Sequence, residues 1–347
     1  MSAIEHTLER PAPSAAGRVA DVMAGRRSRH RRHAVSTVLL GVVLLVLFAV
    51  ALMVGNTFYP LDEVIRVILG ETVPGASFTV GELRLPRALL AVLTGIAFGM
   101  AGVTFQTLLR NPLASPDIIG ISNGAGAAAV IGIVVLSLNG PLVSAFALGG
   151  ALVTAVAIYL LSIKEGFAGT RLILIGIGVS AMLQSVISYV LSRAASWDIQ
   201  TAMQWLTGSL NTASWDRVVP LAIAAAVIVP FMLSQGRALG VLRLGDDSAA
   251  GLGVRVNSTR LLFILSAVAL LAFATAATGP IAARLTGPGA NLLVPSAFVG
   301  AVLVLGGDLI AQFALGTRYP VGVVTGVLGA PYLIYLLIRT NRSGGSL

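Results

Sequence analysis

The chain has 347 residues, of which 56% are hydrophobic and 11% charged, and its formal net charge is +9. Soluble domains carry about 25% charged residues, so this composition excludes a domain that folds in water. The chain lacks cysteine, and its three histidines (His6, His30 and His33) all precede the apolar body, which excludes disulfides, thiolate chemistry and a histidine-based metal site or triad within that body.

Residues 1–33 are rich in Ala, Pro, Ser and Arg and too poor in apolar residues to bury a core, which predicts a disordered tail. The arginine cluster at 26–32 directly precedes an apolar run at 35–54. A basic excess can indicate nucleic acid binding, but beside such a run it indicates contact with anionic lipid and no nucleic acid. We therefore expect a cytoplasmic tail followed by an uncleaved anchor helix.

A polar excursion follows at 56–83, with a short amphipathic helix expected around 61–69. Eight further apolar runs lie at 88–109, 118–138, 142–163, 172–191, 218–233, 261–278, 292–315 and 321–338. They approach or exceed the roughly 20 residues that span a bilayer as a helix, and they lack the alternation of barrel strands. The predicted fold class is an all-α polytopic membrane protein.

Basic residues in the turns indicate the orientation of the spans. The turns at 164–171 and 237–260 and the carboxyl end are all basic, and with Arg110 they are cytoplasmic if the tail is cytoplasmic. This alternation holds through six spans, but nine spans would place the basic carboxyl end outside. A cytoplasmic carboxyl end needs an even number of spans and hence a tenth crossing, and residues 279–291 are the only unassigned stretch.

Three motifs stand in series in the stretch 84–126, which has the pattern of a helix, a tight polar turn and a second helix. They are Arg-Leu-Pro-Arg from residue 84, Asn-Pro-Leu-Ala-Ser-Pro from residue 111, and Gly-Ile-Ser-Asn-Gly-Ala-Gly from residue 120. In this order and spacing they resemble the FecCD family, the permease subunits that carry iron-siderophores, haem or cobalamin through ABC importers. The signature residues of the turn are Asn111, Pro112, Pro116, Asn123 and Gly124.

The resemblance covers about 35–340 and implies one transmembrane permease domain, 34–340, of the ten-helix type in the cell membrane. It implies a binding-protein-dependent importer, first for iron-siderophores, with cobalamin or haem as alternatives. The expected partners are a cytoplasmic ATPase, an extracytoplasmic substrate-binding protein and a second permease subunit, the same or a paralogue. The chain has no phosphate-binding loop, so we expect no enzyme activity or cofactor of its own.

Two other classes of protein fit the sequence less well. A secondary transporter needs charged or polar sites at the membrane midplane, and buried charges are scarce here. An intramembrane enzyme needs a constellation of His, Asp or Ser nucleophiles. The expected path of the ligand follows 172–191 and 321–338, whose small and apolar residues carry no motif that names the ligand.

The segment after residue 278 departs from the family pattern. Relatives continue from Gly-Pro-Ile-Gly/Ala into a short eighth helix, whereas here Gly-Pro-Ile-Ala at 279–282 runs directly into Ala-Arg-Leu-Thr-Gly. About nine residues are missing by this comparison, and nine helical residues would rise only about 13 Å against roughly 30 Å of hydrocarbon. We expect a shortened eighth helix, with 283–288 returning in a protein-lined groove, and impaired transport unless the defect is accommodated.

Arg84 and Arg87 lie three residues apart, hence on one face of the second span. Such arginines commonly only end a helix at the headgroups. The resemblance implies instead that they receive a glutamate of the binding protein through charge-assisted hydrogen bonds. A further family arginine aligns with Gln312, and Arg318 is the candidate to replace it.

The most polar internal loop is 239–257. Asp246, Asp247 and Ser248 suit a helix start and Gly251 and Gly253 its end, which also fits a merely solvated loop. The loop is similar to the family's coupling segment, two short helices that sit in a cleft of the ATPase. The resemblance assigns coupling to Gly245, Asp246, Asp247, Ala250, Gly251, Leu252 and Gly253.

Asp308 is the one acid well inside a long apolar run. We expect its side chain either to reach toward water or to pair with Arg318, because an unpaired acid in hydrocarbon is costly. A proton relay would need more than one such acid. Glycines three or four apart, at 95, 99 and 102 and at 322, 326 and 329, predict close helix packing.

Overall fold

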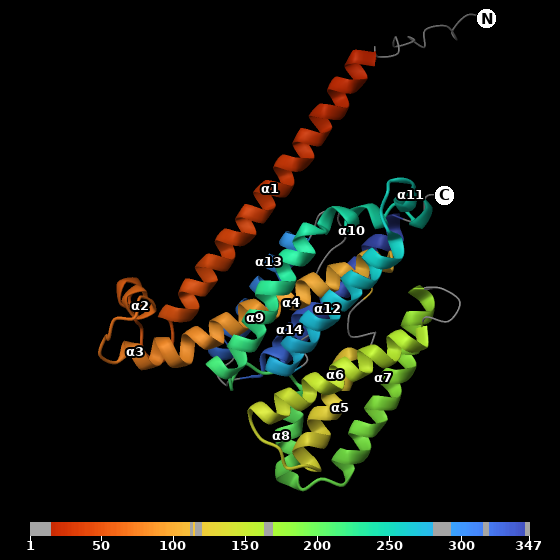
Figure 1. The fold of residues 1–347 in the computed structure, drawn as a ribbon. Helices are drawn as coiled ribbons and strands as arrows, with labels where there is room; N and C mark the ends of the chain where they lie inside the picture. The colour runs from red at the N-terminus through yellow and green to blue at the C-terminus, as the bar shows by residue number, and fades with distance from the viewer. Residues whose placement is uncertain are drawn as a thin grey trace, which may run out of the picture.

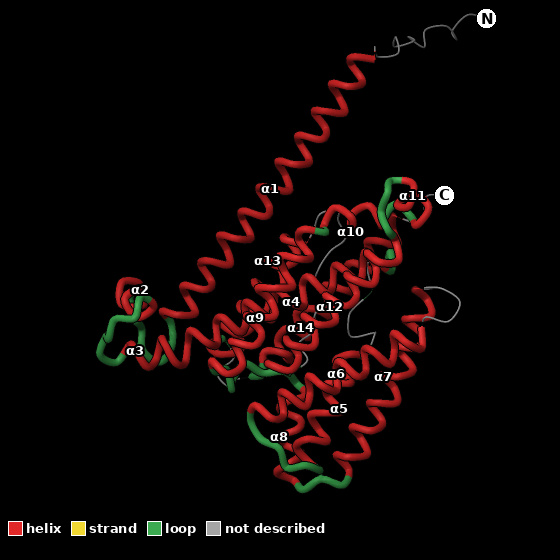
Figure 2. Tube along the Cα trace, in the orientation of Figure 1, coloured by secondary structure: helices red, strands yellow, loops and turns green. Residues whose placement is uncertain are grey.

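The computed structural model describes residues 15–111, 114, 120–162, 169–279, 293–314 and 319–343, and within them the chain is helical and contains no β-strand (Figures 1 and 2). In chain order the elements are α1 (Ala15–Met53), α2 (Leu61–Ile68), α3 (Ala76–Phe78), the π-helix η1 (Thr79–Arg84), α4 (Leu85–Leu108), α5 (Ile121–Val134), α6 (Pro141–Ser162), α7 (Gly169–Ser192), α8 (Ser196–Leu206), α9 (Trp215–Ser234), α10 (Gly236–Leu242), α11 (Asp246–Gly251), α12 (Val256–Thr278), α13 (Leu293–Phe313) and α14 (Val321–Ser343). Among the described residues, seven helices are long and apolar enough to cross a membrane, and α5 and 321–331 of α14 are shorter apolar helices. The all-α polytopic fold class is confirmed.

The first helix is longer than the sequence predicts. Residues 15–33, expected to be disordered, form the first half of α1 and run without a break into the apolar part, Ala34–Met53. The physical reason is that Ala, Arg, Met and Val tolerate a helix, and an existing helix extends at far lower cost than a new one nucleates. The predicted tail at 1–14 lies outside the described residues.

The excursion after α1 contains the expected amphipathic helix, α2, whose Val64 is buried while Ile65 and Ile68 are exposed. The chain then enters the second span through the six-residue π-helix η1, which ends two residues before Pro86 of α4. Proline has no N–H to donate, and in a regular α-helix its ring clashes with the carbonyl four residues earlier. The wider π turn accommodates Pro86 and sets the direction of Arg84, the last residue of η1.

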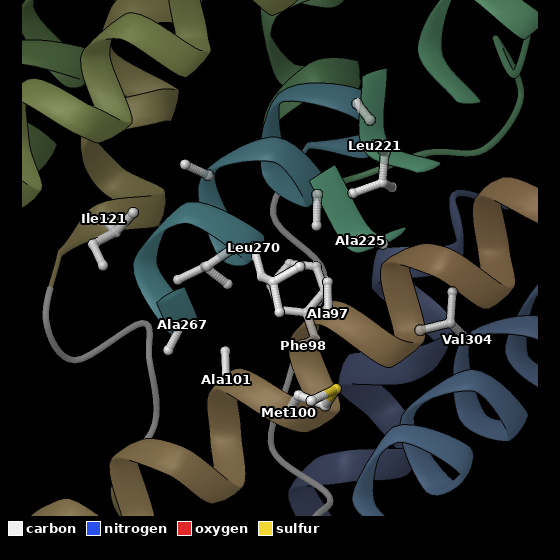
Figure 3. Packing of buried hydrophobic residues seen from close by; sticks show 14 of the residues in the cluster. Ala97, Phe98, Met100, Ala101, Ile121, Leu221, Ala225, Ala267, Leu270 and Val304 are labelled. Atoms are coloured by element: carbon white, nitrogen blue, oxygen red, sulfur yellow. The ribbon is translucent and has the colours of Figure 1, made fainter. Parts of the chain in front are cut away.

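The core is built around α4. From Ala97 to Leu108 every residue of α4 is buried, and α13, α12 and α9 pack around it. Figure 3 shows side chains of these four helices and of α5 converging in this core: Ala97, Phe98, Met100, Ala101, Ile121, Leu221, Ala225, Ala267, Leu270 and Val304. Three described spans, α9, α12 and α13, therefore surround α4 and enclose most of its length.

Glycine allows α4 and α13 to touch through their backbones. A Cβ on Gly300 would overlap the carbonyl oxygen of Gly95, and one on Gly99 would overlap the carbonyl oxygen of Ser296. Small residues three or four apart permit this approach in membranes, as predicted for Gly95 and Gly99. The two helices have no side chain between them at this crossing.

A second group of helices, α5 to α8, lies beside the first (Figure 1), with α5 packed on α6, α7 and α8. The sequence did not indicate α8, which is only 11 residues long and follows α7 after a short turn. α12 contacts both α5 and α6 and so joins the two groups.

Helices α12 and α13 run in the same direction. α12 begins near Asp246, which binds its Arg260, and ends where the Ser209 amide donates to the Thr278 carbonyl at 2.8 Å. α13 begins beside α10, with Leu293 next to Gly236, and carries Asp308 to Arg87 at the other end. Residues 279 and 293 therefore lie at opposite ends of the bundle, while the shortened eighth helix predicted between them lies outside the described residues.

Candidate docking and coupling sites

Arg87 is the centre of a polar cluster at one end of α4, in which Asp308 is buried, Arg87 and Gln312 are half-buried and Asn211 is exposed. Its Nε and Nη2 donate to Oδ2 and Oδ1 of Asp308 at 2.8 Å each, a bidentate geometry, and Nη2 also donates to Oδ1 of Asn211 at 2.9 Å. Gln312 Nε2 donates to Asp308 Oδ2 at 2.7 Å. The side chains of Arg87 and Asp308 are 17% and 3% exposed. We call these four residues the Arg87 cluster, and it joins α4 to α13 and to the α8–α9 connection.

Arg84 binds the carboxyl end of α1 rather than a side-chain acid. Its Nη1 donates to the carbonyls of Leu52 and Met53 at 2.8 Å, and Nη2 donates to the carbonyl of Thr57 at 2.5 Å. The guanidinium also lies over the ring of Tyr59, 5.0 Å from its centroid. The last carbonyls of a helix lack intrahelical partners and carry partial negative charge, so a cation is favoured there.

Both arginines line one pocket of about 340 Å³. Its wall is formed by the end of α1 and the residues after it, by η1, by α4 and by α13: Ala51, Val54, Gly55, Asn56, Thr57, Thr79, Leu83, Arg84, Arg87, Ala88, Leu305, Asp308, Gln312 and Phe313. Both arginines thus face one concave, polar region, as their spacing predicts, and both also have partners within the chain. Their docking role stays a prediction, and Arg318 lies outside the described residues.

Asp308 differs from its expected environment. It is 2% exposed and paired with Arg87, so its side chain does not reach toward water, and the expected pairing with Arg318 involves a residue outside the described part of the chain. The physical reason is that α13 packs against α4, where the Arg87 guanidinium neutralises the charge of Asp308. The sequence does not predict this pair, because the two residues are 221 positions apart.

A second polar cluster lies at the opposite end of α4. Asp246, the first residue of α11, accepts hydrogen bonds from Arg260 Nη2 at 2.9 and 3.0 Å and from Arg110 Nη2. Arg110 follows the end of α4, and Arg260 lies in the first turns of α12. We call these three residues the Asp246 cluster, and it fastens α11 to both neighbouring spans.

The charges of the Asp246 cluster differ in exposure. The side chain of Arg260 is 8% exposed, whereas those of Asp246 and Arg110 are 49% and 47% exposed. Hydrogen bonding from Arg260 is the main cause that holds the pKa of Asp246 below its ordinary value of 3.8, with charge from Arg110 adding to it. The carboxylate is therefore ionised at neutral pH, and the pair with the buried Arg260 is the stronger half of the cluster.

The predicted coupling segment consists of two short helices, α10 and α11. α11 starts at Asp246 and ends at Gly251, as the sequence indicates, between Gly245 and Gly253, whose φ angles are +113° and +84°. No side chain caps α11, because its N-cap residue is Gly245, and Asp246 binds arginines instead. Ala249 is buried, while Leu244 and Leu252 are 64% and 65% exposed. Of the assigned coupling residues, all but the half-buried Gly245 are exposed: Asp246, Asp247, Ala250, Gly251, Leu252 and Gly253.

The signature turn is described only in part. Arg110 has a left-handed φ of +49°, unusual for a residue with a side chain, and the Asn111 amide donates to the Gln106 carbonyl at 3.1 Å. Gly124 packs α5 against α6, because a Cβ there would overlap Thr154. Asn123 is half-buried in the first turns of α5, and Pro112 and Pro116 lie outside the described residues.

The two helices expected to line the ligand path present large side chains to the outside. On α7, Leu174, Met182 and Tyr189 are 60–65% exposed, and on α14 Val327 is 67% exposed. Such faces contact lipid or another subunit in a membrane. This single chain therefore leaves open surface on both helices where a second permease subunit is expected.

Two residues of these clusters were not singled out from the sequence. Asn211 belongs to a polar connection without a motif, and Arg260 was read only as one of several cytoplasmic positive charges. A buried position for Arg260 has one weak signal, which is that it lies four residues inside a helix that is apolar from Leu261 onward. Nothing in the sequence signals Asn211.

Comparisons with known proteins agree with this geometry. The chain is 39% identical to the ferric enterobactin transport system permease protein FepG of Escherichia coli (strain K12) over 299 residues, covering 81% of this chain and 88% of that protein. It is 35% identical to the iron(3+)-hydroxamate import system permease protein FhuG of Bacillus subtilis (strain 168), covering 86% and 95%. It is 37% identical to the vitamin B12 import system permease protein BtuC of Vibrio cholerae serotype O1 (strain ATCC 39315 / El Tor Inaba N16961), covering 76% and 84%.

A solved chain shares the fold, with a TM-score of 0.76 at 24% identity over 87% of this chain and 98% of that one. It comes from a structure assigned to a metal-chelate type ABC transporter in an inward-facing conformation. The model of the FecCD transport family matches residues 42–339, nearly the whole membrane part. The chain belongs to the FecCD transport family.

Proposed function

We propose that this chain is the membrane subunit of a binding-protein-dependent ABC importer and that its ligand is an iron-siderophore. The observation that carries the proposal is its place in a family whose relatives, by their names, are permeases for ferric enterobactin and iron(3+)-hydroxamate. A vitamin B12 permease is also related, so cobalamin is the second candidate ligand. The ligand passes unchanged, and ATP is hydrolysed by another chain.

The α10–α11 segment is the proposed contact with the ATPase. Leu244 and Leu252 are exposed on this segment, which connects the spans α9 and α12, and Asp247 lies between the two leucines in the sequence. Exposed leucines beside polar residues mark a surface for a protein partner. Cross-linking from cysteines placed at Asp247 or Gly251 tests this contact, since the chain has no native cysteine. No ATPase adduct from either position would contradict it.

The pocket between Arg84 and Arg87 is the proposed contact with the substrate-binding protein. An acidic side chain of that protein would bind in this pocket, which is lined by two guanidinium groups. Replacing Arg84 and Arg87 by Glu is expected to weaken binding in nanodiscs, most clearly at low salt, where charge pairing is least screened. Unchanged affinity at low salt in a variant that still inserts would contradict the docking role.

We propose that both termini are cytoplasmic. In Figure 1 the amino-terminal part of α1 and the carboxyl end of α14 point toward the same end of the bundle as α11. An impermeant thiol reagent is expected to label Val294→Cys and Ser343→Cys only from the inside, since α13 begins, and α14 ends, at that end of the bundle. Val294 suits the test because it is 38% exposed. Labelling of residue 343 from outside would contradict it.

The ligand and the consequence of the short 279–291 segment are tested together. Uptake of labelled ferric siderophores, cobalamin and haem is measured in a strain that lacks its own permease and carries the matching ATPase and binding protein. We expect a ferric siderophore to be taken up weakly, and more strongly after insertion of a relative's eighth-helix segment behind residue 282. Full uptake without the insertion would show that the segment is not a defect.

A further inference from the structure

One helix joins the two polar clusters. α4 carries Arg87 in its first turn and is followed two residues after its end by Arg110, so the Arg87 and Asp246 clusters stand at its opposite ends. Its 24 residues are about 36 Å long. No other described helix has an ion pair at or directly beyond both of its ends; the pair at Arg87 is largely buried, and the pair at Arg110 is exposed.

We propose that Asp246 is a positioning residue that fastens the coupling helix α11 to α4 and α12, so that a displacement of α11 by the ATPase moves α4 and is felt at the Arg87 cluster. The inference rests on the proposed function, since it assumes that an ATPase binds α10–α11. It assigns Asp246 a role inside the chain rather than a contact with the ATPase. Asp247, its exposed neighbour, keeps the contact role.

The geometry distinguishes these two neighbouring acids. Asp246 accepts hydrogen bonds from two spans, and one donor, Arg260, is held in a buried position where ionic hydrogen bonds are strong. Within the described part of the chain Asp247 forms no hydrogen bond or ion pair, although both acids have exposed side chains. The Asp246 carboxylate thus has its charge neutralised within the chain through both of its oxygens, whereas Asp247 has no such partner among the described residues.

The path from Asp246 to Arg87 is stiff. Arg110 ends the turn after α4 in a left-handed conformation, and its guanidinium also reaches the Leu242 carbonyl of α10 at 3.4 Å. α4 is enclosed along most of its length, and its backbone touches α13 at Gly95 and Gly300. A displacement at Arg110 therefore moves α4 and α13 together, because close-packed interiors transmit strain rather than absorb it.

The test uses the assembled transporter in nanodiscs, with its ATPase and its loaded binding protein. Three variants form a cycle: Asp246→Asn, Arg110→Gln and the double variant. The first readout is the stimulation of ATP hydrolysis by the binding protein, and the second is the affinity of the ATPase for the permease. Asp62→Asn, an exposed acid on α2 far along the chain from both clusters, is the matched control.

Each single variant is expected to lower the stimulation by about fivefold or more, a typical size for coupling between sites. The double variant is expected to lose no more stimulation than the more strongly affected single variant, because both changes break the same link. The affinity of the ATPase should change by less than about twofold, within the scatter of surface substitutions. Arg110→Gln keeps the test valid if Asp246→Asn fails to fold, because the Arg110 side chain is half-exposed and Arg260 retains its acid.

The alternative outcomes separate the inference from the proposed function. Additive losses, or stimulation unchanged in Arg110→Gln, would overturn the inference and leave the importer intact. Weaker ATPase binding by Asp246→Asn with normal stimulation of the bound fraction would also overturn it, because it would make Asp246 a contact residue. If no ATPase binds the unaltered chain, the proposed function falls, and the inference falls with it.

Discussion

The Arg87 cluster allows a quantitative test of what a buried ion pair contributes to this fold. Asp308→Asn removes the negative charge and leaves Arg87 with the neutral oxygens of residues 211 and 308. Breaking a fully buried pair costs about 3–5 kcal/mol. The Arg87 side chain is 17% exposed and keeps Asn211 as an acceptor, so we expect a smaller loss of about 2 kcal/mol.

That loss corresponds to a fall of roughly 3 °C in the unfolding temperature, because an unfolding entropy of about 2.1 cal/mol/K per residue over 347 residues gives about 1.4 °C per kcal/mol. The assay is thermal unfolding of the purified permease in nanodiscs, followed by tryptophan fluorescence. The exposed Asp216→Asn, on α9, is the control for loss of a negative charge.

A double variant separates the charge from the shape. Arg87→Met with Asp308→Leu removes both charges, and replacing a buried pair by apolar side chains is often neutral, so most of the stability should return, to within about 1 kcal/mol. Binding of the substrate-binding protein should not return with it. The reasoning is refuted if Asp308→Asn unfolds within about 1 °C of the parent, or if the double variant is as unstable as the single one.

Two further predictions follow from the described contacts. Gly322→Ala is expected to destabilise the chain by about 1–3 kcal/mol, since its Cβ would overlap the Thr207 carbonyl, whereas Gly326→Ala, with open space around it, should be tolerated; thermal unfolding of the pair decides this. The stabilisation from Asp246 is expected to be complete above its unfolded pKa of about 3.9 and to be lost as pH falls through its lowered folded pKa. The difference in unfolding temperature between the parent and Asp246→Asn should thus be constant from about pH 5 to 8 and shrink below about pH 4, and a difference that instead shrinks near pH 6 would contradict the assignment.

The spans were predictable because each is specified by its own residues. A run of about 20 apolar residues has to satisfy its backbone internally in hydrocarbon, and a helix does this without distant partners. The nine runs accordingly coincide with α1, α4, α5, α6, α7, α9, α12, α13 and α14 to within a few residues at most ends. The exceptions are residues 15–33, which extend α1; α5, which stops at Val134 rather than at residue 138; and α12 and α14, which exceed their runs by five residues, α12 at its start and α14 at its end.

The partners of the charged residues were not predictable in the same way. Arg87 and Asp308 are 221 residues apart, and Arg110 and Asp246 are 136 apart. No periodicity links residues at such separations, because only the packing of α4 against α13 and α10 brings them together. Arg87, Asp246 and Asp308 are unusual charges in the sequence, and in the fold each forms an ion pair with an opposite charge of the same chain.

The helical form of residues 15–33 determines which arginines can act on lipid. If the hydrocarbon begins at Ala34, Arg31 and Arg32 lie within about 5 Å of it along α1, whereas Arg27 lies about 10 Å away. The Debye length in physiological salt is about 8 Å, so headgroup charge would act on Arg31 and Arg32 and would be largely screened at Arg27. A disordered tail could fold back and bring all three arginines to the membrane. The helix would instead keep Arg31 and Arg32 as the lipid contact and hold Arg27 farther from the bilayer.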